Sequence, residues 1–259
     1  MDLRKNIIPN NVKKIHLIAI CGTGMGALAC MLRDLGFEVT GSDQKIYPPM
    51  SDFLSRKGIK VAEGFNEDNI SYGPDLVVVG NAITKANPEV VKMQNMGLCF
   101  CSMPQAINRF IADNKKRIIV AGTHGKTTTS SIVSWILYKA GLDPSFVIGG
   151  ILKNFSSNYR LGNGEFIVIE GDEYDTAFFD KRAKFLHYLP RMAVVTSLEF
   201  DHGDIYDSIE EIELAFQRML RQIPASGHVI LCADAERALA LQEFAFSNVT
   251  TYGFHNDAE

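Results

Sequence analysis

A segment of glycines, one lysine and several hydroxyl side chains, AGTHGKTTTSS at residues 121–131, lies between two apolar stretches. The stretch at 117–121 is typical of a buried strand, and the stretch from Ile132 onward is typical of a helix. Glycines let backbone N–H groups converge on phosphate oxygens, a helix N-terminus adds positive potential, and a lysine supplies a mobile cation. The segment therefore predicts a loop that binds a triphosphate. Its candidate residues are Gly122, Thr123, His124, Gly125, Lys126, Thr127 and Thr128.

The spacing within this loop is shorter than in the common phosphate-binding loop. The full pattern G-x-x-x-x-G-K-[ST] needs a glycine at position 120, where the chain has Val120. The alternative is an ordinary glycine-rich turn with a solvated lysine. The strand before the loop and the amphipathic helix after it favour the phosphate site, where Thr127 or Thr128 can ligate Mg²⁺.

Acidic side chains follow two other predicted strands. Glu170 ends the apolar run 166–169, and Glu199, Asp201 and His202 follow a run that begins at Met192. Phosphoryl transfer needs metal ligands, and the carboxyl ends of strands in open α/β sheets are where ligands bind. Such residues can also cap helices or form surface hydrogen bonds. Together with the loop at 121–131, these two segments make three candidate sites after strands of one sheet, which favours the nucleotide interpretation.

A second glycine motif lies near the N-terminus. Gly22-Thr-Gly-Met-Gly26 follows an apolar run at 15–20 and gives G-x-G-x-G, which departs from the dinucleotide pattern G-x-G-x-x-G. The motif still suits a diphosphate at a helix N-terminus. Asp43, past the next strand, has two interpretations: it meets a ribose hydroxyl, or it is a turn residue in Gly41-Ser-Asp.

The elements that position these residues alternate between strand and helix. We expect an α/β fold, with a Rossmann-like N-terminal domain at 1–114 and a parallel-sheet ATP-binding domain of the P-loop type at 115–259. The polar stretch 113–117 is the expected linker. Strands are expected at 15–20, 37–40, near 59, 75–79, 98–101, 117–121, 146–148, 166–169, 192–196, 228–231 and 249–252. Helices are expected after Gly22, from about 51, at 88–96, 127–140, 208–222 and 235–244.

Composition excludes several classes of protein. The 259 residues carry a formal charge of −4 and no block of Lys or Arg, which argues against a nucleic-acid surface. No apolar stretch reaches the roughly 20 residues that a membrane span needs, and the N-terminus lacks a signal-peptide core. The five cysteines are scattered and odd in number, so we expect reduced thiols and a cytoplasmic location.

Together the motifs resemble one family. AGTHGKTTT, Glu170, the Asp201-His202 pair and the leading IAICGTGMGALA are similar to the Mur ligases, which build peptidoglycan precursors with ATP. The resemblance implies a uridine-diphosphate sugar in the first domain, ATP in the central one, and a C-terminal domain that helps to close over the nucleotide. This chain ends in the central domain, so we expect it to be an incomplete ligase that is inactive alone.

Three segments point to one branch of the family: YPPM at 47–50, NAITKANPE at 81–89 and the stretch 173–191. They resemble the ligases that join UDP-N-acetylmuramate to L-alanyl-γ-D-glutamyl-meso-diaminopimelate in murein recycling. The implied partners are this sugar nucleotide and this tripeptide, without nucleic acid or membrane, in a monomer or weak dimer. The branch that adds L-alanine to the same sugar nucleotide is the alternative.

The resemblance also implies roles for individual residues. Lys126 holds the β- and γ-phosphates, Thr127 and Glu170 ligate Mg²⁺, and His202 serves a second Mg²⁺, with Lys126, Glu170 and His202 as the catalytic set. The UDP-sugar candidates are Gly22, Thr23, Gly24, Met25, Gly26, Ser42, Asp43 and Asn81. The candidates for substrate contacts are Asp175, Lys181 and Arg182; the alternative for Lys181 and Arg182 is a solvated charged turn.

Two positions depart from the family pattern. Many relatives have Asn where this chain has Ser197, which puts one family contact in doubt. Some branches use a carbamylated lysine where this chain has Gln217, so no modified lysine is expected.

The implied reaction activates a carboxylate with ATP. The lactyl carboxylate of UDP-N-acetylmuramate attacks the γ-phosphate, and the tripeptide amine then displaces phosphate from the acyl phosphate. Three alternatives remain. A folylpolyglutamate synthase-like ligase shares the central ATP site, a nicotinamide dehydrogenase follows from the first glycine motif alone, and a non-catalytic nucleotide-binding module describes the chain if its missing part is essential.

Overall fold

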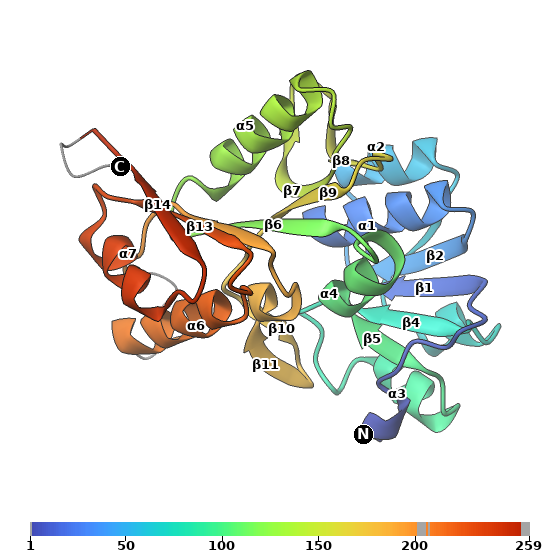
Figure 1. The fold of residues 1–259 in the computed structure, drawn as a ribbon. Coiled ribbons are helices and arrows are strands. Elements are labelled where there is room, and N and C mark those ends of the chain that lie inside the picture. The colour runs from blue at the N-terminus through green and yellow to red at the C-terminus, as the bar shows by residue number, and fades with distance from the viewer. Residues whose placement is uncertain (1, 201–205, 207, 255–259) are drawn as a thin grey trace. The chain divides into compact units, whose positions relative to one another are not determined.

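The computed structural model describes residues 2–200, 206 and 208–254, and the chain forms two compact units (Figure 1). The first unit comprises Met1–Asp113 and Thr176–Lys181, and the second comprises Asn114–Asp175 and Arg182–Glu259. Each unit contains an open sheet with mostly parallel strands and helices packed against it. The predicted α/β fold class is confirmed.

The first unit is built on a five-stranded sheet whose strands are all parallel, in the order β3-β2-β1-β4-β5. The strands are β1 (Lys14–Ile18), β2 (Glu38–Asp43), β3 (Lys60–Glu63), β4 (Leu76–Val79) and β5 (Phe100–Ser102). The helices are α1 (Thr23–Asp34), α2 (Met50–Arg56), α3 (Pro88–Asn95) and α4 (Met103–Ala106), with short turns η1 (Leu3–Lys5) and η2 (Glu67–Ile70) and a π-helical segment η3 (Ile107–Ile111). The strand order reverses between β1 and β4, which is where open α/β sheets bind ligands.

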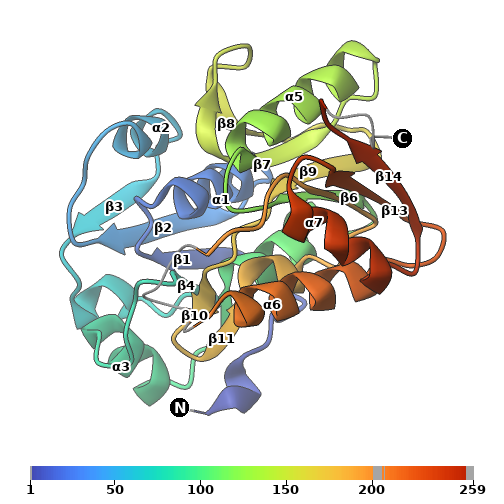
Figure 2. The same ribbon diagram turned by 90° about the vertical axis from the view of Figure 1, so that its left-hand side faces the viewer.

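The buried strands of this sheet explain its two-sided packing. All four residues of β4 are buried, as expected for a parallel strand covered on both faces. Ile18 of β1 packs in one core cluster with Val90 and Met93 of α3, and α1 lies on the opposite face of the sheet (Figure 2). Both faces of the sheet are therefore closed, and the loops at its carboxyl edge remain available for a ligand.

The second unit has a seven-stranded sheet in the order β14-β13-β12-β6-β9-β7-β8. The strands are β6 (Lys116–Ala121), β7 (Ser145–Leu152), β8 (Ser157–Arg160), β9 (Phe166–Glu170), β12 (Met192–Val195), β13 (His228–Cys232) and β14 (Asn248–Tyr252). The helices are α5 (Lys126–Lys139), α6 (Ile209–Arg221) and α7 (Glu236–Ala240), with short turns η4 (Lys184–His187) and η5 (Leu241–Phe244). All pairs are parallel except β7 with β8, so β6 and β9 lie side by side and end at the same edge.

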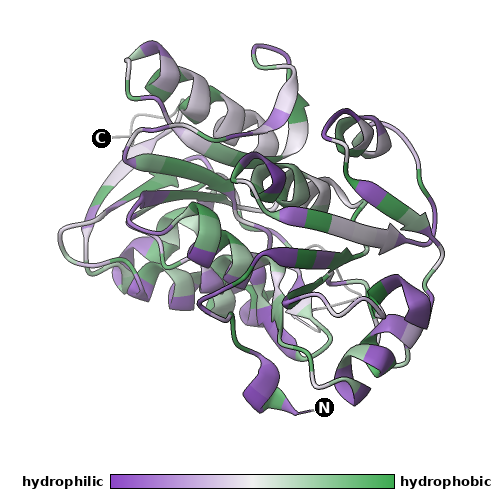
Figure 3. Cartoon of the chain, turned by 90° about the vertical axis from the view of Figure 1, so that its right-hand side faces the viewer, coloured by the Kyte–Doolittle hydropathy of each residue, from purple (hydrophilic) through white to green (hydrophobic). Residues whose placement is uncertain are grey.

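Two helices cover opposite faces of this sheet. Helix α5 lies on one side and α6 on the other (Figure 1). Helix α6 buries Ile212, Phe216 and Leu220 at helical spacing, while its first turn is acidic and its last turn basic, as the helix dipole favours. Figure 3 shows green, hydrophobic segments along many of the strands, while purple, hydrophilic segments are frequent on the helices.

A two-stranded hairpin, β10 (Asp175–Ala177) and β11 (Asp180–Ala183), carries part of the chain from one unit to the other. Its tip, Thr176–Lys181, belongs to the first unit. There Phe178 and Phe179 pack against the core cluster that contains Ile18, and Phe179 meets the ring of Phe100 edge-on at 5.0 Å between centroids. The first unit therefore completes its core with residues from the middle of the sequence.

Most predicted elements are confirmed, with small shifts at their ends. Strand β1 stops at Ile18, two residues earlier than predicted, because Ala19 adopts φ 67° and its N–H bonds to the carbonyl of Ser42. The sequence reading missed α4 with η3, strand β8 and the hairpin. The five cysteines are free thiols, as predicted, although Cys99 and Cys232 are half-buried. No helix in the described part of the chain combines the length and apolarity that crossing a bilayer requires.

Candidate nucleotide site

The loop between β6 and α5 contains two glycines with positive φ, a backbone conformation that other residues rarely adopt. Gly122 and Gly125 have φ of 137° and 80°, and a Cβ on Gly122 would lie 2.2 Å from the Thr196 hydroxyl oxygen. Gly125 is the N-cap of α5 and provides no side-chain cap. The first-turn N–H groups of α5 therefore remain for a ligand, because a helix offers them no internal acceptor.

The loop is supported by the segment after β12. Ser197 accepts hydrogen bonds from the N–H of Thr123 through its carbonyl, at 3.2 Å, and from the N–H of His124 through its hydroxyl, at 2.9 Å. The Thr196 hydroxyl donates to the carbonyl of His124 at 2.5 Å. Ser197, one of the two positions expected to depart from the family pattern, thus holds the loop in place.

Lys126 reaches back across the loop. Its ammonium donates to the carbonyls of Gly122, at 2.7 Å, and Thr123, at 3.3 Å, and to the Glu173 carboxylate at 3.0 Å. The Lys126 side chain is only 16% exposed. The cation is therefore poised at the loop where the predicted phosphates would lie.

Thr127 and Glu170 converge although 43 residues separate them. The Thr127 hydroxyl donates to Glu170 Oε1 at 2.9 Å, and Glu170 Oε2 accepts from the N–H of Gly149 at 2.7 Å. Hydroxyl and carboxylate oxygens are ligands that Mg²⁺ accepts. The described residues contain no cluster of three or more His, Cys, Asp or Glu arranged around a metal.

The acidic loop after β9 is held by Lys184, directly after β11, and by Tyr206. The Lys184 ammonium donates to Asp172 Oδ2 at 2.6 Å, and the Tyr206 hydroxyl donates to the carbonyl of Glu173 at 2.6 Å. Burial, reinforced by nearby carboxylates such as Glu173, raises the pKa of Tyr206 to about 12, so its hydroxyl stays protonated and can donate.

Two predicted residues, Asp201 and His202, lie outside the described residues. Their neighbour Glu199 lies next to the phosphate loop: its N–H donates to the Thr123 hydroxyl at 2.9 Å, and its carboxylate lies 3.7 Å from His124 Nε2. Both side chains of the latter pair are 66% exposed, so solvent screens their attraction.

In the first unit the glycine motif follows β1 and opens α1, with Gly22 as N-cap. The Asp43 carboxylate accepts a hydrogen bond from the N–H of Cys21 at 2.8 Å, and so anchors the loop from the end of β2. Burial, with a smaller contribution from the Asp43 charge, raises the pKa of the Cys21 thiol to about 11, which leaves it protonated. The first-turn N–H groups of α1 are the groups a diphosphate would meet.

The other residues predicted to bind the UDP-sugar surround this loop. Ser42 is fully buried and donates to Glu89 Oε2 at 2.6 Å, so its hydroxyl supports the sheet edge and does not face solvent. Asn81 is exposed and follows Gly80, where a Cβ would lie 3.0 Å from that of Ala19. The ends of β1 and β4 therefore approach closely, and Asn81 lies beside the glycine loop.

The three predicted substrate contacts lie on the hairpin. Asp175 opens β10 and is half-buried, while Lys181 and Arg182 are exposed on β11. Asp175 and Arg182 belong to the second unit and Lys181 to the first.

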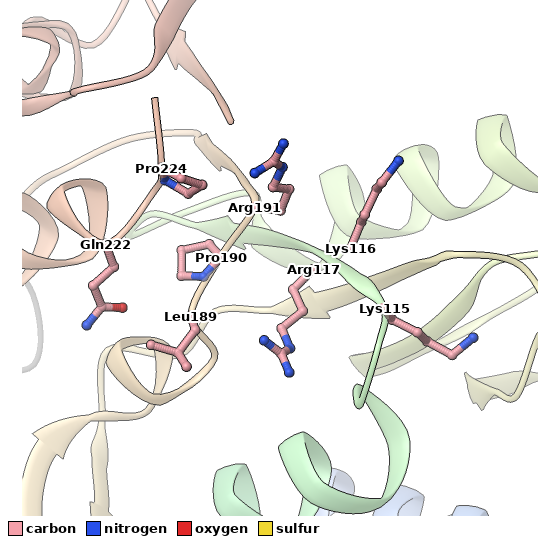
Figure 4. Close-up of a pocket in the computed structure, with 8 residues that line it drawn as sticks. All are labelled: Lys115, Lys116, Arg117, Leu189, Pro190, Arg191, Gln222 and Pro224. Atoms are coloured by element: carbon pink, nitrogen blue, oxygen red, sulfur yellow. The ribbon is translucent and has the colours of Figure 1, made fainter. Parts of the chain in front are cut away.

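Two cavities flank the sheet of the second unit. One, of about 410 Å³, begins at Thr127 and Thr128 and continues along α5 to Trp135 and Phe155. The other, of about 480 Å³, lies at the opposite end of β6 and β12 and is lined by Lys115, Lys116, Arg117, Leu189, Pro190, Arg191, Gln222 and Pro224. Its basic side chains fan out in different directions (Figure 4), and Lys115 and Lys116 bind the carbonyl of Gly162 and the carboxylate of Glu165. Only the first cavity adjoins the phosphate loop.

The sequence reading missed Glu173, Gly149 and the role of Ser197 at the site. The acidic run 170–175 was visible in the sequence, but the sequence does not show which acid turns toward Lys126. The Gly149-Gly150 pair within β7 was an available signal, because glycines inside a strand often mark a close approach. In the structure a Cβ on Gly149 would lie 3.1 Å from Glu170 Oε1.

Fold and site define an α/β protein with a candidate phosphate-binding loop on a mostly parallel sheet, preceded by a Rossmann-like unit. Its sequence matches two family profiles, described as Mur ligase family, catalytic domain, over residues 14–115, and Mur ligase middle domain, over residues 120–259. The chain belongs to the Mur ligase family, as its motifs predicted.

Several characterised relatives are similar over most of the chain. It is 46% identical over 217 residues to the UDP-N-acetylmuramate–L-alanyl-γ-D-glutamyl-meso-2,6-diaminoheptandioate ligase of Escherichia coli, covering 84% of this chain and 48% of that protein. It is 40% identical over 257 residues to the UDP-N-acetylmuramate–L-alanine ligase of Neisseria gonorrhoeae, covering 98% of this chain and 52% of that protein. The chain thus spans about half the length of these relatives.

A crystal structure of the tripeptide ligase from Neisseria meningitides is also similar, with a TM-score of 0.88 and 40% identity over 93% of this chain and 78% of that one. The L-alanine ligase structure from Thermotoga maritima follows with a TM-score of 0.78 and 27% identity.

Proposed function

We propose that the chain is the nucleotide-binding part of an ATP-dependent ligase that joins UDP-N-acetylmuramate to L-alanyl-γ-D-glutamyl-meso-diaminopimelate. The observation that carries this proposal is the convergence of Lys126, Thr127 and Glu170 at the carboxyl edge of one sheet. The higher identity to the tripeptide ligase of Escherichia coli, 46% against 40% for the L-alanine ligase of Neisseria gonorrhoeae, supports the choice of acceptor.

The residues of the second unit would align and neutralise a triphosphate. Lys126 and the first-turn amides of α5 would hold the phosphates, and Thr127 with Glu170 would hold Mg²⁺. A bound Mg²⁺ supplies further charge neutralisation. The lactyl carboxylate would then attack the γ-phosphorus and release ADP, and the tripeptide amine would attack the acyl carbon and release phosphate. The amide forms without a redox change.

The first unit would bind the sugar nucleotide. Its glycine loop, anchored by Asp43, would hold the diphosphate at the N-terminus of α1, and Asn81 would lie within reach. We also propose that the two units together act in the cytoplasm on small molecules, in keeping with their composition.

Calorimetric titration of the chain tests these assignments. We expect saturable binding of UDP-N-acetylmuramate and of ATP with Mg²⁺, no binding of NAD⁺, and loss of ATP binding in Lys126→Ala. Binding of NAD⁺ in place of the sugar nucleotide would refute the proposal. Phosphate release should then be compared with the tripeptide and with L-alanine as acceptors. Preference for L-alanine favours the alternative ligase, and binding without turnover with either acceptor favours a non-catalytic fragment.

A further inference from the structure

The lysine of the phosphate loop has an acidic partner outside the loop. An ammonium group has three N–H donors, and Lys126 directs them to the carbonyls of Gly122 and Thr123 and to Glu173 Oε1. Glu173 is only 3% exposed and Lys126 16%, so bulk solvent and salt screen their attraction weakly. The pair is therefore a largely buried contact between the loop and the segment after β9, and not a surface ion pair.

Glu173 has little freedom to move away from this position. The Tyr206 hydroxyl holds its carbonyl at 2.6 Å. On the preceding residue, the Asp172 carboxylate accepts from the N–H of Tyr174 at 2.9 Å and from the Lys184 ammonium at 2.6 Å. Lys126, by contrast, has a flexible four-carbon stem. Any exchange of partners must therefore be made by the lysine.

A polyphosphate that recruits Lys126 must replace at least one of its three protein acceptors. The carboxylate of Glu173 then remains buried close to the phosphates, with a charge of the same sign. Even at the effective dielectric constant of about 20 that applies in proteins, like charges a few ångströms apart repel by more than the free energy of a tenfold change in affinity.

We infer that Glu173 is a positioning residue, which holds the Lys126 ammonium over the loop and whose carboxylate charge limits the affinity of the site for nucleoside polyphosphates. The inference rests on the proposed ATP site and adds a residue to it. Because the repulsion acts on the phosphates nearest Lys126, the effect of Glu173 should be larger for ATP than for ADP.

The variant Glu173→Gln tests the charge alone, because the amide keeps the size and an oxygen that can accept from Lys126. We expect calorimetry with Mg²⁺ to show ATP binding tightened by about tenfold and ADP binding tightened less. The control is Glu165→Gln, which removes an acid of the same unit that pairs with Lys116 and is 55% exposed; its affinities should match those of the wild type. Unchanged or weaker ATP binding overturns the inference, since a merely structural defect would weaken the binding of both nucleotides. An equal gain for ATP and ADP also overturns it, because the repulsion should act mainly on ATP.

A second measurement needs no nucleotide. Mass spectrometry after brief treatment with acetic anhydride reports how strongly each lysine amine is held. In Glu173→Ala, Lys126 should be acetylated several-fold faster than in the wild type, with no change at the exposed Lys139. An unchanged rate at Lys126 overturns the positioning role. If the wild type fails to bind ATP, the proposed function fails, while the acetylation rates still decide whether Glu173 holds the lysine.

Discussion

Gly122 should be the least replaceable residue of the phosphate loop. In Gly122→Ala, the new Cβ would lie 2.2 Å from the Thr196 hydroxyl oxygen and 2.9 Å from the backbone nitrogen of Ser197, at a φ of 137°. The strained backbone costs about 1–3 kcal/mol. Displacing Thr196 also breaks its hydrogen bond to the carbonyl of His124, which costs about 0.5–1.5 kcal/mol more.

The matched control is Gly141→Ala, just after α5. Gly141 also has a positive φ, 75°, but a Cβ there would meet no atom within 4 Å. This variant therefore carries the backbone strain without the collision. It should lose about 1–2 kcal/mol of unfolding free energy and keep nucleotide binding.

Urea denaturation and ATP titration of both variants separate the two effects. We expect Gly122→Ala to lose about 2–4 kcal/mol and measurable ATP binding, because the strain and the collision add at a loop that holds the phosphates. Equal destabilisation in the two variants, or wild-type ATP affinity in Gly122→Ala, would refute the reasoning, because it would mean that Thr196 and Ser197 do not confine the loop.

Three other changes have definite expected outcomes. Thr127→Val should weaken Mg²⁺-dependent ATP binding by about tenfold or more with little loss of stability, whereas Thr127→Ser should retain binding; equal affinities for the two variants in calorimetry would contradict the metal assignment. Phe179→Ala should lower the unfolding free energy by about 1–3 kcal/mol, less than the roughly 3–5 kcal/mol of a fully buried Phe because this ring is half-buried. The control Phe246→Ala, at a side chain 70% exposed, should leave the unfolding free energy unchanged in urea denaturation. Burial raises the pKa of Glu89, but hydrogen bonds from His16, Ser42 and Asn69 outweigh it and hold the pKa below its ordinary value of 4.5. The resulting stabilisation is present above pH 4.5 and disappears as the pH falls through the lowered pKa, so acid should destabilise the wild type more than Glu89→Gln; parallel urea curves at neutral and acidic pH would contradict this.

The sequence was sufficient for most strands, most helices and the glycine-containing loop between β6 and α5. These features depend on local signals: apolar runs of strand length, helical spacing after Lys126, and glycines where the backbone needs positive φ. The pairing of β6 with β9 then places Glu170 at the same sheet edge as the loop.

The missed features depend on contacts between distant residues. The polar side chains of Lys181 and Arg182 made them candidates for substrate contacts. The adjacent Phe178 and Phe179 are half-buried against a core cluster whose other members lie more than 70 residues away in sequence. Ser197 could be identified as a departure from the family pattern, but its two hydrogen bonds to the loop follow only from the fold. Strand β8 pairs with β7 in the antiparallel direction, and a βαβ alternation predicts only parallel neighbours, so β8 was not predicted.

The tip of the hairpin has a consequence for how the protein is made. During translation, Met1–Asp113 emerges from the ribosome well before Thr176–Lys181, yet both segments belong to the first unit. During synthesis that unit can form its sheet early, but its core lacks Phe178 and Phe179 until the hairpin has emerged. Maturation of the N-terminal unit is thereby delayed until β6, α5 and β9 of the next unit are also available to fold.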